Sequence, residues 1–521
     1  MKAKLLRIFV IAICTAVLAS CSSKKDNDLD VMLSTATNDN DFLVVSVDVE
    51  RLFEQMEIKE DDGRIELPEY MQKVINMFGN RSMRKGVELF TDGLKGIDYD
   101  DALLAFGEDK NGMNGLFVFA LDDEDAFISS LRKINPRVQK GETADFKTVT
   151  VDDAQILMKD NLAYVAFTEQ GCAKYTDAVD LIDARMKAAA ANPLASWKRK
   201  CLERDNIGNC VLDTKKWMEF EGVSGAGEVQ PAGPGNFGDY VAAAINLEGP
   251  EIKLSSEMLD KNGSVVTLPY MGKFDTGLMR YAWPGDFMAV SLSMNSKGYS
   301  ELGAMMRKSI SETLNRQRSG FFETKHFEAM ADQITRIPEE FVADGGIFAS
   351  FGFAGGVSMS NTDFNSPEAY HFVVAVDIKP GKISEASEAA VKELVEIGGE
   401  KVSPSVIRFK TADNYDYRTG EWVTSYFNIN VRSDGNTLVI SNGDIKKGTS
   451  TPFSEKVFGQ SAFAFQILVN DKNPLVSQMG FKEGLDCYAF AKADKSELVL
   501  RLTNTKNKFV PAVFGIMTGN F

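Results

Sequence analysis

Histidine is nearly absent from this sequence: only His326 and His371, of 521 residues, carry an imidazole. A metal site built from several histidines is therefore excluded. A hydrolase of the Ser-His-Asp or Cys-His type would have to use one of these two residues, and no GxSxG nucleophile elbow accompanies either. His326 lies in a helical pattern and His371 at the start of an expected strand, so the sequence predicts no histidine-based triad.

Other signatures of chemistry are missing too. The six cysteines form no CxxC pair, which gives no support to a zinc ribbon or a thioredoxin-type site. No GxxxxGK[ST] phosphate loop occurs. The segment "GPGNFG" at 233–238 fits GxGxxG, but it precedes an expected strand instead of opening a helix, so it is a chance match. We therefore expect no catalytic residues, no cofactor and no metal site.

Long apolar runs are missing as well. The run Ile8–Leu18 has 11 residues, whereas a helix that crosses a bilayer needs about 20, and no later segment is long enough. This run follows Lys2, Lys4 and Arg7. A basic start, a short apolar core and small residues before a cleavage site are typical of a secretory signal peptide, which we place at 1–20.

The end of this signal carries a specific motif. Leu18-Ala19-Ser20-Cys21 resembles the lipobox of bacterial lipoproteins, [LVI]-[ASTVI]-[GAS]-Cys. The resemblance implies that the Cys21 thiol receives a diacylglycerol, that the chain is cut before Cys21 and that the new amine is acylated. Several acyl chains on one residue would hold the protein at a membrane without a spanning helix. An ordinary signal peptide, cut at an Ala-x-Ser-like site, is the alternative interpretation.

The residues after Cys21 suggest where the anchor is. Residues 21–40 are polar and charged, and we expect a flexible tether there. Ser22 is not the Asp that retains lipoproteins in the inner membrane of enterobacteria. Asp26, Asp28 and Asp30 loosely resemble the acidic surface-export tether of Bacteroides-type lipoproteins. The resemblance implies a lipid-anchored protein of the outer membrane, and it leaves open whether the protein faces the periplasm or the cell surface.

Basic side chains are in deficit. Loss of residues 1–20 removes three of them, which leaves 55 basic against 74 acidic side chains and a net charge of −19. Such a chain is not expected to bind nucleic acid or anionic lipid through bulk charge. The excess of acidic groups is explained by solubility.

Four cysteines remain once Cys14 is lost with the signal and Cys21 is lipidated: Cys172, Cys201, Cys210 and Cys487. An exported location permits disulfides. Cys201–Cys210 is the easiest loop to close, and buried free thiols are the alternative. The sequence leaves these two open.

The sequence also repeats itself. "DFLVVSV" from Asp41 resembles "DFMAVSL" from Asp286, and "ALLAFGED" from Ala102 resembles "IFASFGFA" from Ile347, both at an offset of 245 residues. Five further pairs of segments follow in the same order. This pattern predicts a tandem duplication. The alternative is the general strand–helix rhythm that α+β chains share.

The expected domains follow from this repeat. Unit one covers 41–270, with a Gly/Pro-rich surface loop at 222–238, and unit two covers 286–521. Residues around Pro269–Pro284 would form the junction. Strand–helix steps mixed with hairpins predict an α+β fold, in which helices pack on one face of a largely antiparallel sheet.

The whole pattern resembles a family of Bacteroides-type lipoproteins of unknown function. The lipobox, the short polar segment, the "VVSVDVERLF" opening and the repeated strand–Asp–helix units carry the resemblance. It implies a location and supplies no active site.

Two hypotheses about function follow. The first is a non-catalytic binding or envelope-structural lipoprotein, whose partners are the membrane, through Cys21, and a glycan or envelope protein. The second is an envelope enzyme with an unrecognised carboxylate site that acts on glycans. The four tryptophans could stack on sugars, but core packing explains them better, and Trp422 is the one expected to be exposed.

Overall fold

The computed structural model describes residues 28–61, 64–78, 91, 95–109, 112–151, 154–168, 171–172, 175–220, 238–267, 271–300, 340–353, 370–416, 420–443, 451–459, 461–469, 484–503 and 505–517. Contacts divide the chain into two compact units. Unit 1 takes the described residues of Met1–Ser224, Gly238–Val265 and Thr505–Phe521, and unit 2 takes those of Gly225–Phe237 and Val266–Asn504.

Strands and helices alternate irregularly along unit 1. Its strands are β1 (Leu43–Asp48), β2 (Lys59–Asp61), β3 (Arg64–Glu66), β4 (Asp98–Asp109), β5 (Gly112–Ala120), β6 (Gln139–Glu142), β7 (Lys147–Val151), β8 (Ala154–Lys159), β9 (Leu162–Thr168), β10 (Gly171–Cys172), β11 (Gly208–Asp213), β12 (Tyr240–Glu248) and β13 (Glu251–Leu259). Its helices are α2 (Asp28–Ala36), α3 (Val49–Met56), α4 (Glu69–Phe78), α6 (Glu124–Ile134), α7 (Tyr175–Ala191), α8 (Ser196–Leu202), α9 (Thr214–Phe220) and α15 (Phe509–Met517).

Unit 2 has a similar mixture. Its strands are β14 (Asp286–Leu292), β15 (Val342–Phe353), β16 (Tyr370–Ile378), β17 (Glu400–Ser403), β18 (Val406–Asp416), β19 (Glu421–Asp434), β20 (Thr437–Ser441), β21 (Phe463–Val469), β22 (Gly484–Ala491) and β23 (Lys495–Thr503). Its described helices are the 3-10 helix η1 (Thr276–Tyr281), α12 (Ile383–Glu396) and α13 (Glu455–Phe458).

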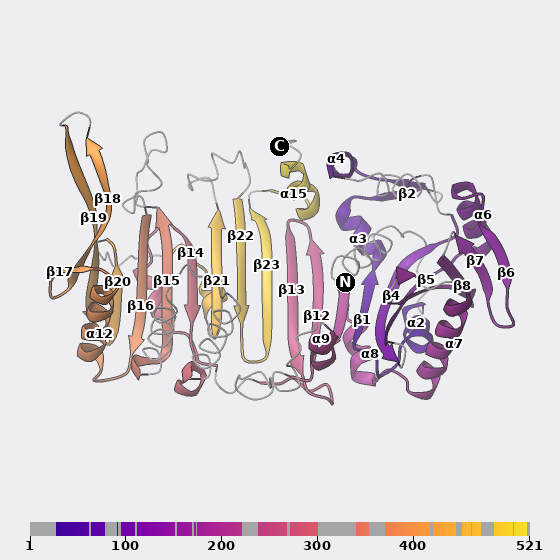
Figure 1. Cartoon of the computed structure of the whole chain (residues 1–521), viewed down its shortest axis with the longest axis horizontal. Helices are drawn as coiled ribbons and strands as arrows, with labels where there is room; N and C mark the ends of the chain where they lie inside the picture. The colour runs from indigo at the N-terminus through magenta and orange to yellow at the C-terminus, as the bar shows by residue number, and fades with distance from the viewer. Residues whose placement is uncertain are drawn as a thin grey trace, which may run out of the picture. The chain divides into compact units, whose positions relative to one another are not determined.

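Each unit is built on an antiparallel sheet, as predicted. In unit 1 the strands lie in the order β13-β12-β11-β1-β4-β5-β9-β8-β7-β6, with β10 paired to the end of β9. In unit 2 the order is β23-β22-β21-β14-β15-β16-β20-β19-β18-β17. Every one of these pairings is antiparallel, and most of the strands carry labels in Figure 1. Both units are therefore α+β.

Helices cover both faces of the unit 1 sheet. On the side that we call the α3 face, Phe53 of α3 and Phe127 of α6 join an apolar cluster with strand residues such as Leu104. On the opposite side, the α2 face, Leu33 of α2 and Ile182 of α7 pack in a second cluster. The prediction that helices pack on one face is wrong, because strands such as β5, with its "GLFVFA", are apolar on both sides.

The unit 2 sheet is also covered on both faces. Val376 of β16 and Leu438 of β20 pack with α12. Their chain neighbours Ala375 and Val439 point to the other face and pack with η1 and α13. The strand residues of both units thus have two apolar layers to join.

The central strands of the two units pair in the same register. Leu43 of β1 pairs with Phe106 of β4, and 245 residues later Met288 of β14 pairs with Phe351 of β15. Each central strand is also paired on its other side, β1 with β11 and β14 with β21.

The start of the described chain differs from the prediction. Residues 28–40 were expected to be a flexible tether, but Asp28–Ala36 form α2. Met32, Leu33 and Ala36 are at most 1% exposed and belong to the α2-face cluster. The tether prediction is wrong from Asp28 onward, because Leu29, Met32, Leu33 and Ala36 make one apolar helix face. Residues 21–27 lie outside the described residues.

The unit boundaries also differ from those predicted. The predicted junction around Pro269–Pro284 overlaps residues of unit 2, because Phe274, Leu278 and Tyr281 lie in a buried cluster of that unit. The C-terminal helix α15 groups with unit 1, where the Phe509 backbone N–H donates to the Gly249 carbonyl oxygen at 2.7 Å. The loop expected at 222–238 lies outside the described residues, except for Gly238.

No helix in the described part of the chain is both long enough and apolar enough to span a bilayer.

Candidate functional site

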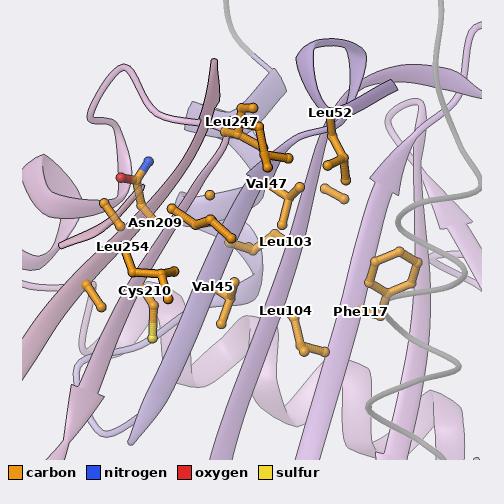
Figure 2. Close-up of a pocket in the computed structure, with 16 residues that line it drawn as sticks. Val45, Val47, Leu52, Leu103, Leu104, Phe117, Asn209, Cys210, Leu247 and Leu254 are labelled. Atoms are coloured by element: carbon orange, nitrogen blue, oxygen red, sulfur yellow. The ribbon is translucent and has the colours of Figure 1, made fainter. Parts of the chain in front are cut away.

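An apolar pocket lies on the α3 face of unit 1. Its volume is about 570 Å³, and strands β4, β1, β11 and β12 form much of its floor beside Leu52 of α3 (Figure 2). Pockets of about 300–1,000 Å³ are typical of small-molecule sites. The described residues that line it are Val45, Val47, Leu52, Ala102, Leu103, Leu104, Phe117, Ile207, Gly208, Asn209, Cys210, Ala243, Ala244, Ile245, Leu247 and Leu254.

Two rows of residues run across the strands and form the floor of the pocket. In pairing order the first row is Phe117, Leu104, Val45, Cys210 and Ala243. The second row is Ala102, Val47, Gly208, Ile245 and Leu254. Small residues in the middle of both rows leave the floor hollow.

Unit 2 has bulky side chains at the matching pairing positions. Val45 pairs with Cys210, whereas Val290 of β14 pairs with Phe465. One step along the same strands, Val47 pairs with Gly208 and Leu292 pairs with Phe463. Two phenyl rings thus stand in unit 2 where unit 1 has a thiol and a hydrogen atom.

The pocket offers hydrophobic contact and little else. Burial raises the pKa of the Cys210 thiol to about 12, so this thiol is protonated and a poor nucleophile at neutral pH. Asn209 turns its amide away, donating to the main-chain oxygens of Leu202 and Arg204 at 3.1 and 2.8 Å. The other side chains among the described lining residues are aliphatic or aromatic. Such a lining can bind an apolar molecule and has no acid, base or nucleophile to transform it.

The disulfide that the sequence left open between Cys201 and Cys210 is not formed. Both cysteines are free, and so is Cys487. Cys201 packs in the α2-face cluster while Cys210 packs against the α3-face cluster, so their side chains point to opposite sides of the sheet. The alternative of free thiols is what the structure has.

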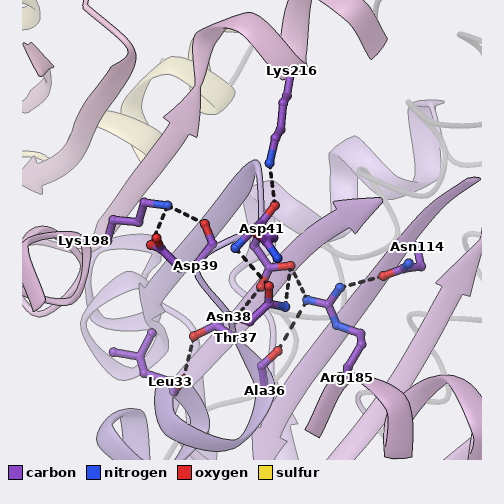
Figure 3. Close-up of polar contacts among 11 residues, drawn as sticks. Leu33, Ala36, Thr37, Asn38, Asp39, Asp41, Asn114, Arg185, Lys198 and Lys216 are labelled. Carbon is purple, nitrogen blue, oxygen red and sulfur yellow. Dashed lines mark hydrogen bonds and ion pairs between the residues drawn. The ribbon is translucent and has the colours of Figure 1, made fainter. Parts of the chain in front are cut away.

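A buried ion pair fastens the start of β1. Asp41 and Arg185 of α7 are each 5% exposed, and Arg185 Nη2 lies 2.9 Å from Asp41 Oδ1. Arg185 Nη1 donates to Asn114 Oδ1 at 2.6 Å, and the Asn38 backbone N–H donates to Asp41 Oδ2 at 2.9 Å (Figure 3). Burial raises the pKa of the Asp41 carboxyl, and the Arg185 guanidinium opposes that rise.

Two lysines from other helices donate hydrogen bonds to the turn between α2 and β1. Lys198 of α8, 2% exposed, donates to the Asp39 main-chain oxygen at 2.8 Å and lies 4.7 Å from the centroid of the Tyr240 ring. Lys216 of α9 donates to the Asn40 main-chain oxygen at 3.0 Å. Three cationic side chains from three helices thus converge on the connection between α2 and β1 (Figure 3).

His371 lies beside Asp286, the unit 2 aspartate that is 245 residues after Asp41. It is 2% exposed, its Nδ1 lies 3.0 Å from Asp286 Oδ1, and its ring stacks on Trp283 with centroids 3.7 Å apart. Ser350 Oγ donates to Asp286 Oδ2 at 2.6 Å. The serine therefore bonds the aspartate and not the histidine, which is not the arrangement of a nucleophilic triad. His326 lies outside the described residues.

One carboxyl group has a strongly shifted pKa. Burial raises the pKa of Asp101 to about 7, with further contributions from Asp48 and Asp100. Asp101 pairs directly with Asp48 across β1 and β4, so two like charges face each other. Because the folded-state pKa lies above the usual value, this group stabilises the fold below about pH 4 and loses that contribution as the pH rises through about 7.

The tryptophans are spread over both units. Trp197 contacts Tyr240 with ring centroids 5.0 Å apart, and Trp217 packs against the α3-face cluster. Trp283 stacks on His371. Trp422 is 70% exposed, as predicted. The described tryptophans therefore do not gather into one sugar-stacking face.

Cys21 lies outside the described residues. Among the residues that the structure does describe, no three His, Cys, Asp or Glu side chains come together in a way that could hold a metal ion. The pocket itself is absent from the sequence predictions.

No family model matches this chain, and no curated protein matches it. Among solved structures, the chain is similar to TP0453 in its crystal form III. The two sequences are 8% identical, the match covers 43% of this chain and 79% of that chain, and the TM-score is 0.27. Crystal form I of TP0453 is 7% identical, covers 45% of this chain and 80% of that chain, and has the same TM-score. Similarity this low carries no conclusion about fold or function.

Proposed function

We propose that this chain is a non-catalytic, lipid-anchored protein of the cell envelope that binds an apolar ligand in the pocket of unit 1. The volume of about 570 Å³ lined by aliphatic and aromatic side chains is the observation that carries this proposal. A glycan needs hydrogen-bond partners that the described lining side chains do not supply, so the pocket favours an apolar ligand over a sugar.

The alternative, an enzyme with a carboxylate site, has one feature in its favour. Asp101 has a raised pKa beside Asp48, and carboxylate pairs with different pKa values are typical of glycosidases. However, Asp101 and its neighbour Ala102 point to opposite sides of β4, and it is Ala102 that lines the pocket. The carboxylate pair and the pocket therefore do not combine into one active site.

The anchor is proposed to be Cys21, on the strength of the lipobox alone, with the outer membrane as the location. We expect labelled palmitate to be incorporated into the chain during growth. The Cys21→Ala variant should incorporate none and should be released from the membrane fraction. Equal labelling of this variant, or an unlabelled wild type, would contradict the anchor.

We also propose that the two units arose by tandem duplication. The same strand order and the same central register support this. The turn before the central strand is shared as well: the backbone N–H of Asn38 donates to Asp41, and that of Trp283 donates to Asp286. A general strand–helix rhythm would account for the order of the elements but not for these local details.

A contact across the central strands supports the duplication further. A Cβ atom on Gly107 would come within 2.6 Å of Asp41 Oδ1, and one on Gly352 within 2.5 Å of Asp286 Oδ1. Both glycines are 245 residues apart, as are both aspartates. The repeated "DF" and "FG" pairs in the sequence are thus explained by one buried aspartate that needs a glycine opposite it.

The proposed ligand site is tested by a substitution that fills the pocket with a larger side chain. We expect Cys210→Phe, which places in unit 1 the ring that unit 2 has at the matching position, to weaken binding of the fluorescent apolar probe N-phenyl-1-naphthylamine about tenfold or more. Displacing two methylene equivalents, at about 0.8 kcal/mol each, is enough for that change. Fluorescence titration of the chain from residue 21 on, carrying Cys21→Ala so that no acyl chain competes, measures it.

Cys210→Ser is the matched control, because it leaves the hollow open and should keep the affinity within about threefold. Ala243→Phe blocks the same hollow from the neighbouring strand and serves if Cys210→Phe does not fold. A probe affinity that is unchanged in both phenylalanine variants, with thermal unfolding intact, would refute a ligand site here.

A further inference from the structure

The pocket in unit 1 is a trough with a definite direction. Each row of its floor runs over five neighbouring strands, so with about 4.8 Å between strands the trough is about 19 Å long. Its two rows are separated by two residues along a strand, for example Val45 and Val47, which is about 7 Å, and Leu247 lines the pocket two residues beyond Ile245. The lining therefore extends farther across the strands than along them.

One end of the trough exposes large apolar side chains. Ile245 is 36% exposed and Leu254 is 39% exposed, and both line the pocket. Exposed contiguous apolar surface marks a site that something else covers. A ligand that continues along the second row would cover both side chains.

We infer that the ligand is a lipid with a single unbranched aliphatic chain, which lies across the strands of the unit 1 sheet. This inference rests on the proposed function of the same pocket and names its ligand class. A flexible straight chain can follow a floor that runs over five twisted strands, whereas a rigid fused-ring lipid cannot bend with it. The described lining residues supply no charged partner, so the chain and not the head group determines affinity.

A chain-length series tests this inference. The probes are n-alkanols and the matching fatty acids with 8, 10, 12 and 14 carbons, kept below the concentrations at which they self-associate. Displacement of N-phenyl-1-naphthylamine measures their affinity. We expect about fourfold tighter binding for each added methylene, and about 15-fold for each pair, in both series. A rigid four-ring sterol should compete at least tenfold more weakly than tetradecanol.

Each outcome separates this inference from the proposed function. A sterol that competes as well as tetradecanol, or a flat chain-length series, overturns the aliphatic-chain assignment, while the apolar pocket stands if Cys210→Phe still weakens probe binding about tenfold or more. If the phenylalanine variant binds the probe and every alkanol like the wild type, the proposed pocket itself fails. A steep series in the wild type that becomes flat in Cys210→Phe supports both.

Discussion

The Arg185→Met variant is expected to lose about 3–5 kcal/mol of unfolding free energy at pH 8. Arg185 is the cationic partner of Asp41, and both side chains are almost fully buried. Removal of one member of a buried ion pair leaves the other charge without compensation, which costs that amount. Among the described residues, the hydrogen bonds from Asn38 would remain to the carboxylate. Denaturant unfolding followed by circular dichroism measures the change.

The loss should be smaller at acid pH. Burial already raises the pKa of Asp41, and without the guanidinium its pKa rises further. The folded variant then keeps a proton on Asp41 that the unfolded chain releases, so its stability is retained at low pH and lost as the pH rises through the folded-state pKa. We therefore expect a larger difference from the wild type at pH 8 than at pH 5.

Two further variants control for this explanation. Asp41→Asn in the Arg185→Met background should recover part of the lost stability, because a neutral amide leaves no unpaired charge. Arg204→Met breaks an ion pair with Glu257 that is partly exposed, with side chains 41% and 31% exposed, and should cost at most about 1 kcal/mol. A cost of Arg185→Met no greater than that of Arg204→Met would show that the buried pair does not fasten the start of β1.

The second large effect is expected in α2. Leu33→Ala should cost about 2–5 kcal/mol, because Leu33 is 1% exposed and its removal leaves a cavity in the α2-face cluster. Val31 is on the same helix and 38% exposed, so Val31→Ala should change stability by no more than about 0.5 kcal/mol. Thermal and urea unfolding of the two variants measure the difference. Equal, small effects would restore the tether interpretation of residues 28–40.

The signal for α2 was present in the sequence. Leu29, Met32, Leu33 and Ala36 follow the i, i+3, i+4, i+7 spacing of a helix face. The surrounding charges, such as Asp28 and Asp30, make the segment look like a solvated linker by composition. Its helix is only 9 residues long, and helices that short owe their stability to tertiary packing, which composition does not reveal.

The strands of the two similar segments were predictable because they depend on local patterns. "DFLVVSV" and "DFMAVSL" both form central strands, and Asp48 caps α3 by accepting from the Arg51 backbone N–H at 2.9 Å. The continuous apolar run of β5 also indicates that both faces of the sheet are covered.

The pocket could not be predicted in the same way. Taken singly, small residues such as Gly208, Ala243 and Ala102 carry no signal of a pocket in the sequence. The hollow exists because three strands that are far apart in the sequence bring these residues together. The one sequence signal is a contrast between the units. Phe463 and Phe465 match Gly208 and Cys210 once the strand pairings are known, and the pairings require the fold.

The packing of α2 onto the sheet limits the distance between the folded part of the protein and the bilayer. With the proposed anchor at Cys21, only seven residue steps separate the acylated residue from Asp28, the first residue of α2. A fully extended chain covers at most about 3.6 Å per step, so the segment from Cys21 to Asp28 can span no more than about 25 Å. Asp28 would then stay within one bilayer thickness of the lipid surface.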